Sequence, residues 1–233
     1  MKNFKSLIYY IGVAMFFMVF PVNGQLTKID PKELEKQFYL SKDKSDEIVK
    51  DYSWYYRTDV IRDGKVVSIR IEACRYGSDG KLQEKIINNQ EAALPSTFLI
   101  HEIAQEQKTK LVTFLNDLRV FLEKYALSDK KLGSCFFSNA IIGSPDPNGQ
   151  VLVNGKDVIV KGDKLQWWID LHIKAVTKAS LVTTFEDNQV EFTATYKYID
   201  PGLQYMNFAE IKVPSKNVIV QLQFYDYSKR NHV

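Results

Sequence analysis

Few residues of this chain have the types and spacing that catalysis requires, and the nearest approach to a metal motif begins at His101. His101, Glu102 and Gln105 resemble the zinc motif H-E-x-x-H, in which two histidines one helical turn apart bind the metal and the glutamate acts as base. Gln105 replaces the second histidine, and an amide is a poor zinc ligand. Only His172 and His232 remain elsewhere. We therefore expect no metal site here, only an exposed helix start.

A hydrolytic site would need a nucleophile beside a histidine and an orienting acid. The nearest stretch, Leu132–Cys135, lacks the second glycine of the nucleophile elbow G-x-S-x-G. Carboxylate pairs such as Glu186 and Asp187 fall in predicted turns, where solvation explains them. No glycine-rich phosphate loop occurs. We predict a protein that is not an enzyme and has no cofactor, with an unrecognised hydrolase as the third-ranked hypothesis.

The N-terminus has the plan of a secretory signal peptide. Lys2 and Lys5 precede an uncharged apolar run from Leu7 to Phe20, and a helix break with small or branched residues follows at 21–24. The alternative is a retained membrane span, but the run is shorter than the roughly 20 residues that a span needs. We predict cleavage near Gly24 and a soluble protein that is periplasmic or secreted. No cysteine lies at this point to carry a lipid anchor.

Removal of residues 1–24 leaves 209 of the 233 residues, which suits a single domain at 25–233. Lys2 and Lys5 leave with the signal, so the 31 basic residues become 29 against 28 acidic ones, a net charge of +1. Such a balance attracts neither nucleic acid nor an anionic membrane as a whole. Cys74 and Cys135 are too few for a disulfide scaffold. We leave open whether they are bridged, and we predict that the fold does not need them.

Most of the chain alternates apolar and polar residues, the pattern of half-buried strands. The stretch from Leu165 to Tyr227 predicts several antiparallel strands in a row. Earlier, two Asp-Gly turns at 63–64 and 79–80 join three further strands between Tyr52 and Ile87. Helical spacing predicts exposed helical pieces from Asp30 to Asp51 and a long helix at 97–127 with a break near Gln107. It also predicts one or two turns within 131–142. The order of elements predicts an α+β fold with an antiparallel sheet and the helices against one face.

This order resembles the half-barrel superfamily of the periplasmic outer-membrane lipoprotein carrier (LolA-like) and related exported lipid-binding proteins. The resemblance rests on Val158–Asp163, which is similar to a strand and turn of those proteins, and on Trp167–Asp170, similar to their W-[IV]-D strand end. Ala179–Phe185 matches the next strand, and the hairpin from Trp54 to Tyr76 is also similar. The turn after Asp170 lacks the proline and glycine often found there. The resemblance implies one large curved antiparallel sheet, a half-barrel, wrapped over two or three helices around an apolar cavity.

Aromatic residues make up 13% of the chain and gather on the predicted strands. They are ordinary core residues of strands, so a self-filled core is the simpler interpretation. A curved sheet, however, has a concave face larger than two or three helices easily fill, and an unfilled apolar concavity is a ligand site by default. The expected ligand-binding residues are Tyr52, Trp54, Tyr56, Ile69, Ile71, Trp167, Ile169, Phe192, Tyr196 and Phe224.

The leading hypothesis is an exported binding protein that holds an acyl chain, another lipid or a lipidated protein between sheet and helices. The alternative is an interaction or scaffold domain of the cell envelope whose core is filled by its own side chains. We expect an apolar small molecule, lipid or lipidated protein as partner, no nucleic acid, and a monomer. Peripheral contact with the outer membrane is left open.

Overall fold

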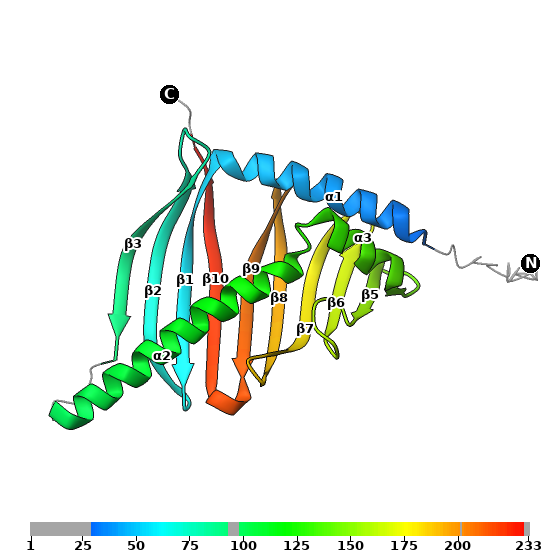
Figure 1. Ribbon diagram of the computed structural model, residues 1–233. Coiled ribbons are helices and arrows are strands. Elements are labelled where there is room, and N and C mark those ends of the chain that lie inside the picture. The colour runs from blue at the N-terminus through cyan, green and yellow to red at the C-terminus, as the bar shows by residue number, and fades with distance from the viewer. Residues whose placement is uncertain (1–28, 93–97, 201, 231–233) are drawn as a thin grey trace, which may run out of the picture.

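The computed structural model describes residues 29–92, 98–200 and 202–230, and the predicted signal peptide at 1–24 lies outside them. These residues form one curved, ten-stranded antiparallel sheet with three α-helices on one side (Figure 1). The α+β fold predicted from the sequence is thereby confirmed. The helices are α1 (Pro31–Ile48), α2 (Phe98–Glu123) and α3 (Lys130–Asn139). The strands are β1 (Tyr52–Arg62), β2 (Lys65–Tyr76), β3 (Leu82–Glu91), β4 (Ile141–Ile142), β5 (Gln150–Lys156), β6 (Lys164–Asp170), β7 (Ala175–Phe185), β8 (Asn188–Asp200), β9 (Leu203–Val213) and β10 (Val218–Lys229).

The strand order explains why a long helix crosses the sheet. The order is β3-β2-β1-β10-β9-β8-β7-β6-β5-β4, so the chain leaves the sheet at one edge and re-enters it at the other. Ten strands about 4.8 Å apart place these edges roughly 43 Å from each other along the sheet. The 26 residues of α2 span about 39 Å at 1.5 Å per residue. Helix α2 therefore runs diagonally over the concave face, as Figure 1 shows.

The local signals for α1 are confirmed, whereas the expected break in the long helix is wrong. The Asp30 side chain accepts a hydrogen bond from the Lys32 amide at 3.0 Å, and Pro31 occupies the first turn of α1. Helix α2 is continuous through Gln107. It contains neither proline nor glycine, the residues that most often break a helix. No described helix is long and apolar enough to cross a membrane.

The three N-terminal strands and the first hairpin turn are also as predicted. Asp63 and Gly64 both have positive φ, at 51° and 74°, as a two-residue turn between twisted strands requires. By contrast, Val158–Gly162 is a loop between β5 and β6 rather than the strand suggested by the resemblance. The carboxylate of Asp163 organises this loop, because it accepts hydrogen bonds from three consecutive backbone amides, those of residues 158–160.

Asp163 also fixes the end of α2. It is 2% exposed and accepts a hydrogen bond from the Tyr125 hydroxyl at 2.7 Å, and that hydroxyl lies 2.9 Å from the Thr183 hydroxyl on β7. Burial alone would raise the pKa of Asp163, but the backbone amides and Tyr125 outweigh it, and the pKa is lowered. The buried carboxylate thus anchors the turn after α2 to the sheet.

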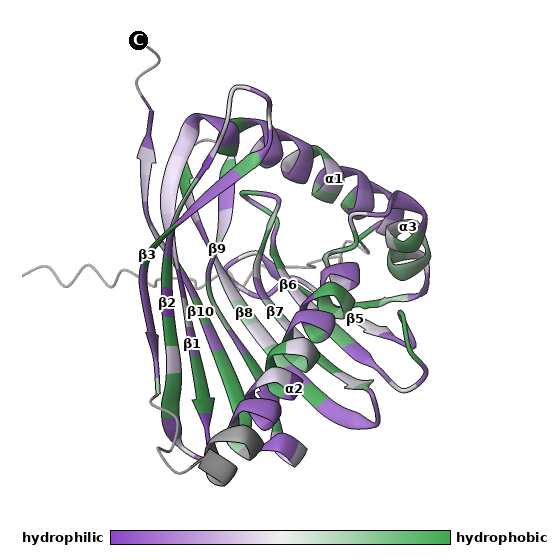
Figure 2. Ribbon diagram, turned by 60° about the vertical axis from the view of Figure 1, so that its left-hand side comes forward, coloured by the Kyte–Doolittle hydropathy of each residue, from purple (hydrophilic) through white to green (hydrophobic). Residues whose placement is uncertain are grey.

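Helix α1 has separate anchors. The Ser45 hydroxyl donates to the Gln204 carbonyl at 2.8 Å and accepts from the Gln204 amide at 3.1 Å, which ties α1 to the start of β9. The Tyr39 hydroxyl donates to the Leu127 carbonyl at 3.0 Å and lies so close to Gly133 of α3 that any Cβ there would collide with it. Helix α1 therefore lies along the ends of the strands, apart from α2 (Figures 1 and 2).

The concave face carries two packed clusters of buried apolar side chains. One lies beneath α3 and the first half of α1, with Phe137 and Val151 completely buried. The other lies beneath the middle of α2, where Phe114 and Leu118 pack against β8, β9 and β10. Each helix therefore packs on its own part of the sheet, and a cavity lies between α1 and α2.

Candidate ligand-binding cavity

A cavity of about 520 Å³ lies between the concave face and the two long helices. Seven consecutive members of the sheet, from β2 to β6 through β1 and β10, contribute to its wall, and β3 reaches its edge. Its volume falls within the range of roughly 300–1,000 Å³ typical of small-molecule sites. The apolar lining residues are Phe38, Trp54, Tyr56, Cys74, Leu82, Leu122, Tyr125, Ala126, Leu165, Trp167, Ala175, Val176, Ala179, Leu181, Phe192, Tyr196, Tyr205, Met206, Ile211, Leu222 and Phe224.

Small side chains occupy the middle of the concave face, and one of them, Ala179, lines the cavity. Ala179, Ala194 and Ala209 are directly opposite one another on β7, β8 and β9. Residues opposite each other in an antiparallel pair point to the same side of the sheet. The same row ends in Trp167 on β6 and Leu222 on β10, whose side chains reach farther from the sheet. The side chains of this row therefore extend least from the sheet at its centre and farthest at its two ends.

Stacked aromatic rings form one end of the cavity. Trp54 lies parallel to Tyr227 at 5.4 Å between ring centroids, and Tyr227 lies 4.2 Å from Tyr205. A bulge brings Tyr227 to this face. The pairing of β1 with β10 slips beside Trp54, where Asp226 has a φ of 54°, so Tyr227 can turn toward Trp54. Burial raises the pKa of Tyr227 above its ordinary value.

Two further tyrosines present hydroxyl groups within this apolar wall. Tyr56 stacks on Phe224 at 4.6 Å, and burial raises its pKa. Burial also raises the pKa of Tyr196 to about 12. Both phenols are therefore neutral at physiological pH and add no charge to the interior.

The charged side chains that line the cavity are those of Lys42, Asp46, Glu84, Arg119, Glu123 and Lys174, and all but the half-buried Lys42 are exposed. Lys42 and Asp46 form an ion pair of 2.6 Å on α1, and Arg119 lies 3.6 Å from Glu123 on α2. Lys174, in the turn between β6 and β7, is exposed and completes the cations of the rim. An apolar interior with a mixed-charge mouth fits a molecule whose long apolar part is buried while its polar end stays in water.

Of the ten residues expected to bind ligand, the structure places six in the cavity wall. Two others are buried elsewhere. Tyr52 is buried at the start of β1 and does not line the cavity, and Ile169 faces a separate recess beneath α1. The six that line the cavity are Trp54, Tyr56, Trp167, Phe192, Tyr196 and Phe224.

Ile69 and Ile71 do not belong to the wall, and their expected placement needs correction. Trp54 is opposite Cys74, so the even-numbered residues of β2 share the concave face with Trp54. Ile69 and Ile71 have the other parity and lie on the convex face. The apolar alternation of β2 misled the prediction because its concave side carries polar residues, including the buried Glu72.

Sequence reasoning missed the helical part of the wall. Phe38 and Ser41 of α1 and Leu122 of α2 line the cavity. The apolar periodicity of a helix shows which of its faces is buried, but not whether that face meets side chains or empty space. Cys74 was missed as a lining residue because the odd-numbered residues of β2, such as Ile69, were expected on the concave face in place of the even-numbered ones.

The residues considered for catalysis are scattered. The described residues contain no cluster of three or more His, Cys, Asp or Glu side chains that could hold a metal ion. The side chain of His101 is outside the described residues, and His172 is exposed. Ser134 on α3 donates a hydrogen bond to Glu35 rather than to a histidine. Cys74 and Cys135 are both free thiols, and burial raises the pKa of Cys74 to about 11.

No protein-family model and no curated protein matches the sequence. Solved structures with a similar fold include a DUF1329 family protein from Desulfovibrio piger, with a TM-score of 0.42 and 10% identity over 88% of this chain and 95% of that one. A LolA superfamily protein from Nitrosomonas europaea has a TM-score of 0.37 and 10% identity over 88% and 96%. A Vibrio parahaemolyticus protein described as an outer-membrane lipoprotein-sorting domain has a TM-score of 0.41 and 10% identity over 88% and 95%. The LolA superfamily that the sequence suggested is thus among the proteins that this chain is similar to in structure, and at these scores the likeness says nothing about a ligand.

Proposed function

We propose that this protein is an exported, non-enzymatic binding protein that holds an acyl chain or a similarly apolar ligand between its curved sheet and its helices. The observation that carries the proposal is the cavity of about 520 Å³ bounded by α1, α2 and the concave face. Its interior is apolar, and its charged side chains stand at the mouth. Contact with the wall would bury each methylene group of such a chain, at a gain of about 0.8 kcal/mol.

The size and the chemistry of the mouth support a ligand with one polar end. Lys42, Asp46, Arg119 and Glu123 form two ion pairs at the rim, so the mouth is hydrated and nearly neutral. A free fatty acid, a lipid or the acyl chain of a lipidated protein could enter tail first and leave its polar part outside. The predicted signal peptide supports a periplasmic or secreted location, and a monomer with no nucleic-acid partner remains our expectation.

Two alternatives fit the structure less well. A scaffold with a self-filled core would not leave a cavity of this size beside Ala179 on β7. A hydrolase would need an activated nucleophile, but the thiol that lines the cavity, Cys74, has its pKa raised to about 11 and is protonated at neutral pH. Ser45 at the rim is held by both backbone groups of Gln204.

The proposal is tested by saturable uptake of a fluorescent fatty acid, together with native mass spectrometry of the protein as purified. The matched variants lie two residues apart on α2. Leu122 lines the cavity, whereas Val120 is 55% exposed on the outer side. Leu122→Trp should weaken uptake by about tenfold, the loss of roughly two methylene contacts, and Val120→Trp should leave it unchanged. The proposal fails if the unsubstituted protein takes up no apolar probe, or if both variants bind it equally well.

A further inference from the structure

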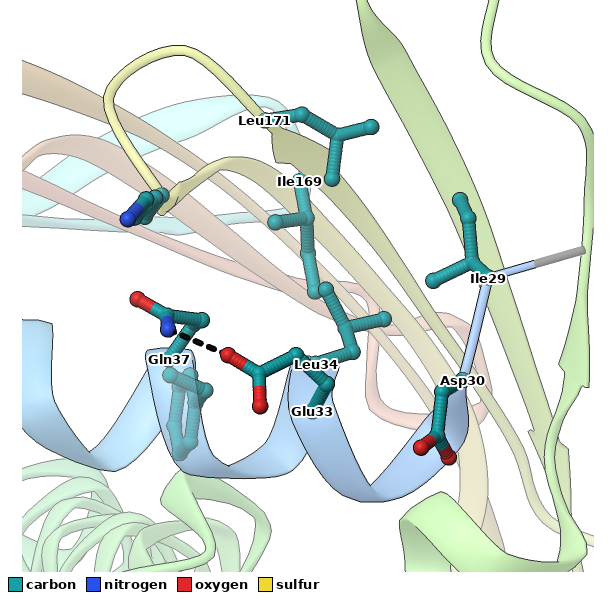
Figure 3. Close-up of a pocket in the computed structure, with 9 residues that line it drawn as sticks. Ile29, Asp30, Glu33, Leu34, Gln37, Ile169 and Leu171 are labelled. Carbon is teal, nitrogen blue, oxygen red and sulfur yellow. Dashed lines mark hydrogen bonds between the residues drawn. The ribbon is translucent and has the colours of Figure 1, made fainter. Parts of the chain in front are cut away.

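A second apolar recess lies beside the main cavity, beneath the first turns of α1. Its volume is about 360 Å³, and it is lined from α1, β6 and the β6–β7 turn. Ile29, Leu34, Ile169 and Leu171 face one another across it, while Glu33 and Gln37 are hydrogen-bonded to each other on α1 (Figure 3). Asp30, Glu33 and Gln37 lie at the start of α1 and Lys174 lies in the β6–β7 turn, whereas the part of β6 that lines the recess is apolar.

The two spaces share a wall. Phe38 and Lys174 line both of them, so the recess and the main cavity meet at these side chains. The Phe38 ring lies 4.9 Å from the ring of Trp167, which lines the main cavity, and 5.7 Å from Phe137 in the packed core. Phe38 is only half-buried, although it contacts three aromatic rings. Phe38 is therefore the aromatic side chain that lies, beside Lys174, between the two spaces.

We propose that the recess is the far part of the ligand site and that Phe38 is the partition that sets how long a ligand chain can be bound. This inference rests on the proposed function. The ligand class it names is an unbranched alkyl or acyl chain, because only such a chain can continue past a single side chain from one narrow apolar space into the next. With Phe38 in place, the chain ends at its ring. With a smaller residue there, the chain can reach Leu34 and Ile169.

The test measures affinity against chain length. A homologous series of saturated fatty acids displaces a fluorescent fatty acid from the full-length mature protein. In the unsubstituted protein, affinity should rise about fourfold with each added methylene and then stop rising once the chain reaches Phe38. Phe38→Ala should move that break point to longer chains, and because Phe38 lines the main cavity it should also lower the affinities of the shorter chains by a common factor. Phe38→Leu, a milder change, should move it less and keeps the test valid if the alanine variant folds poorly.

A second substitution separates partition from packing. Leu34 lines the recess and not the main cavity, and it is 4% exposed. Leu34→Phe should narrow the recess, so it should leave the unsubstituted break point unchanged and move that break point part of the way back in the Phe38→Ala protein. An unshifted break point in both Phe38 variants would overturn the partition while the proposed function stands. A protein that binds no member of the series overturns both.

Discussion

Trp54 offers the sharpest test of whether the aromatic end of the cavity is a ligand wall or ordinary core. The substitution Trp54→Ala removes a ring that is 8% exposed and stacks on Tyr227 at 5.4 Å. A large aromatic deleted from a packed core costs about 3–5 kcal/mol. One part of the Trp54 ring borders the cavity, where no protein atoms are lost. We therefore expect the free energy of unfolding to fall by only about 2–3 kcal/mol, of which the stack with Tyr227 contributes about 1 kcal/mol.

Phe114 is the matched control because its exposure is nearly the same. It is 6% exposed, but it lies in the cluster beneath α2, outside the cavity, and packs 5.6 Å from Phe185. Phe114→Ala should lower the free energy of unfolding by about 3–5 kcal/mol. It should change the affinity for an apolar probe by no more than about twofold. Trp54→Ala should weaken the same affinity about tenfold, which equals about 1.4 kcal/mol.

Urea unfolding and fluorescent fatty acid binding on the same three proteins decide the matter. The reasoning is refuted if Trp54→Ala destabilises the fold as much as Phe114→Ala does and leaves probe affinity unchanged. In that case the ring is part of the core, and the space beside it has no role in binding.

Three further predictions follow from buried titratable groups. Asp163→Asn removes the charge from four hydrogen bonds and should lower the free energy of unfolding by about 2–3 kcal/mol in urea melts at pH 7. Because the folded pKa of Asp163 is lowered, its stabilisation is present above the unfolded pKa of about 3.9 and is lost as the pH falls below it, so the two proteins should converge in acid. Burial raises the pKa of Tyr196 to about 12, so its contribution to stability is present below pH 10 and is lost as the pH rises from there. In Tyr196→Phe, the free energy of unfolding should therefore fall less steeply with pH in that range. At pH 8 a thiol reagent should label the exposed Cys135 and not the buried Cys74 in the folded protein, and replacing both by Ala should leave the fold intact, at a cost well below about 4 kcal/mol.

The parts of the fold that were predictable from the sequence are those that depend on a few consecutive residues. Asp63 and Gly64 form the expected hairpin turn, and Asp30 with Pro31 begins α1, because turn and cap geometry depend on a few neighbouring residues. Strand parity was less certain. Trp54 was placed correctly on the concave face, whereas Ile69 lies on the convex face.

The β2 error has a physical cause that period-two patterns cannot reveal. A strand near the edge of a sheet buries little of either face, so apolar residues on one side do not identify the core. On β2 the pairing with β1 decides the faces, and it puts Cys74 and Glu72 inside. The Glu72 carboxylate accepts a hydrogen bond from Arg70 at 2.6 Å, which is how a buried acidic group is tolerated there.

The cavity itself depends on contacts between residues far apart in the chain. Tyr125 reaches Asp163 across 38 residues and fixes the end of α2, and Ser45 reaches Gln204 across 159 residues and fixes α1. Neither anchor produces a periodic pattern, yet together they hold the helices on separate parts of the sheet. Seen in the sequence alone, alanines on neighbouring strands are compatible with a helix packed closely against the sheet and equally with an empty space above it. Only the positions of the two helices, set by these anchors, leave the space above Ala179 unfilled.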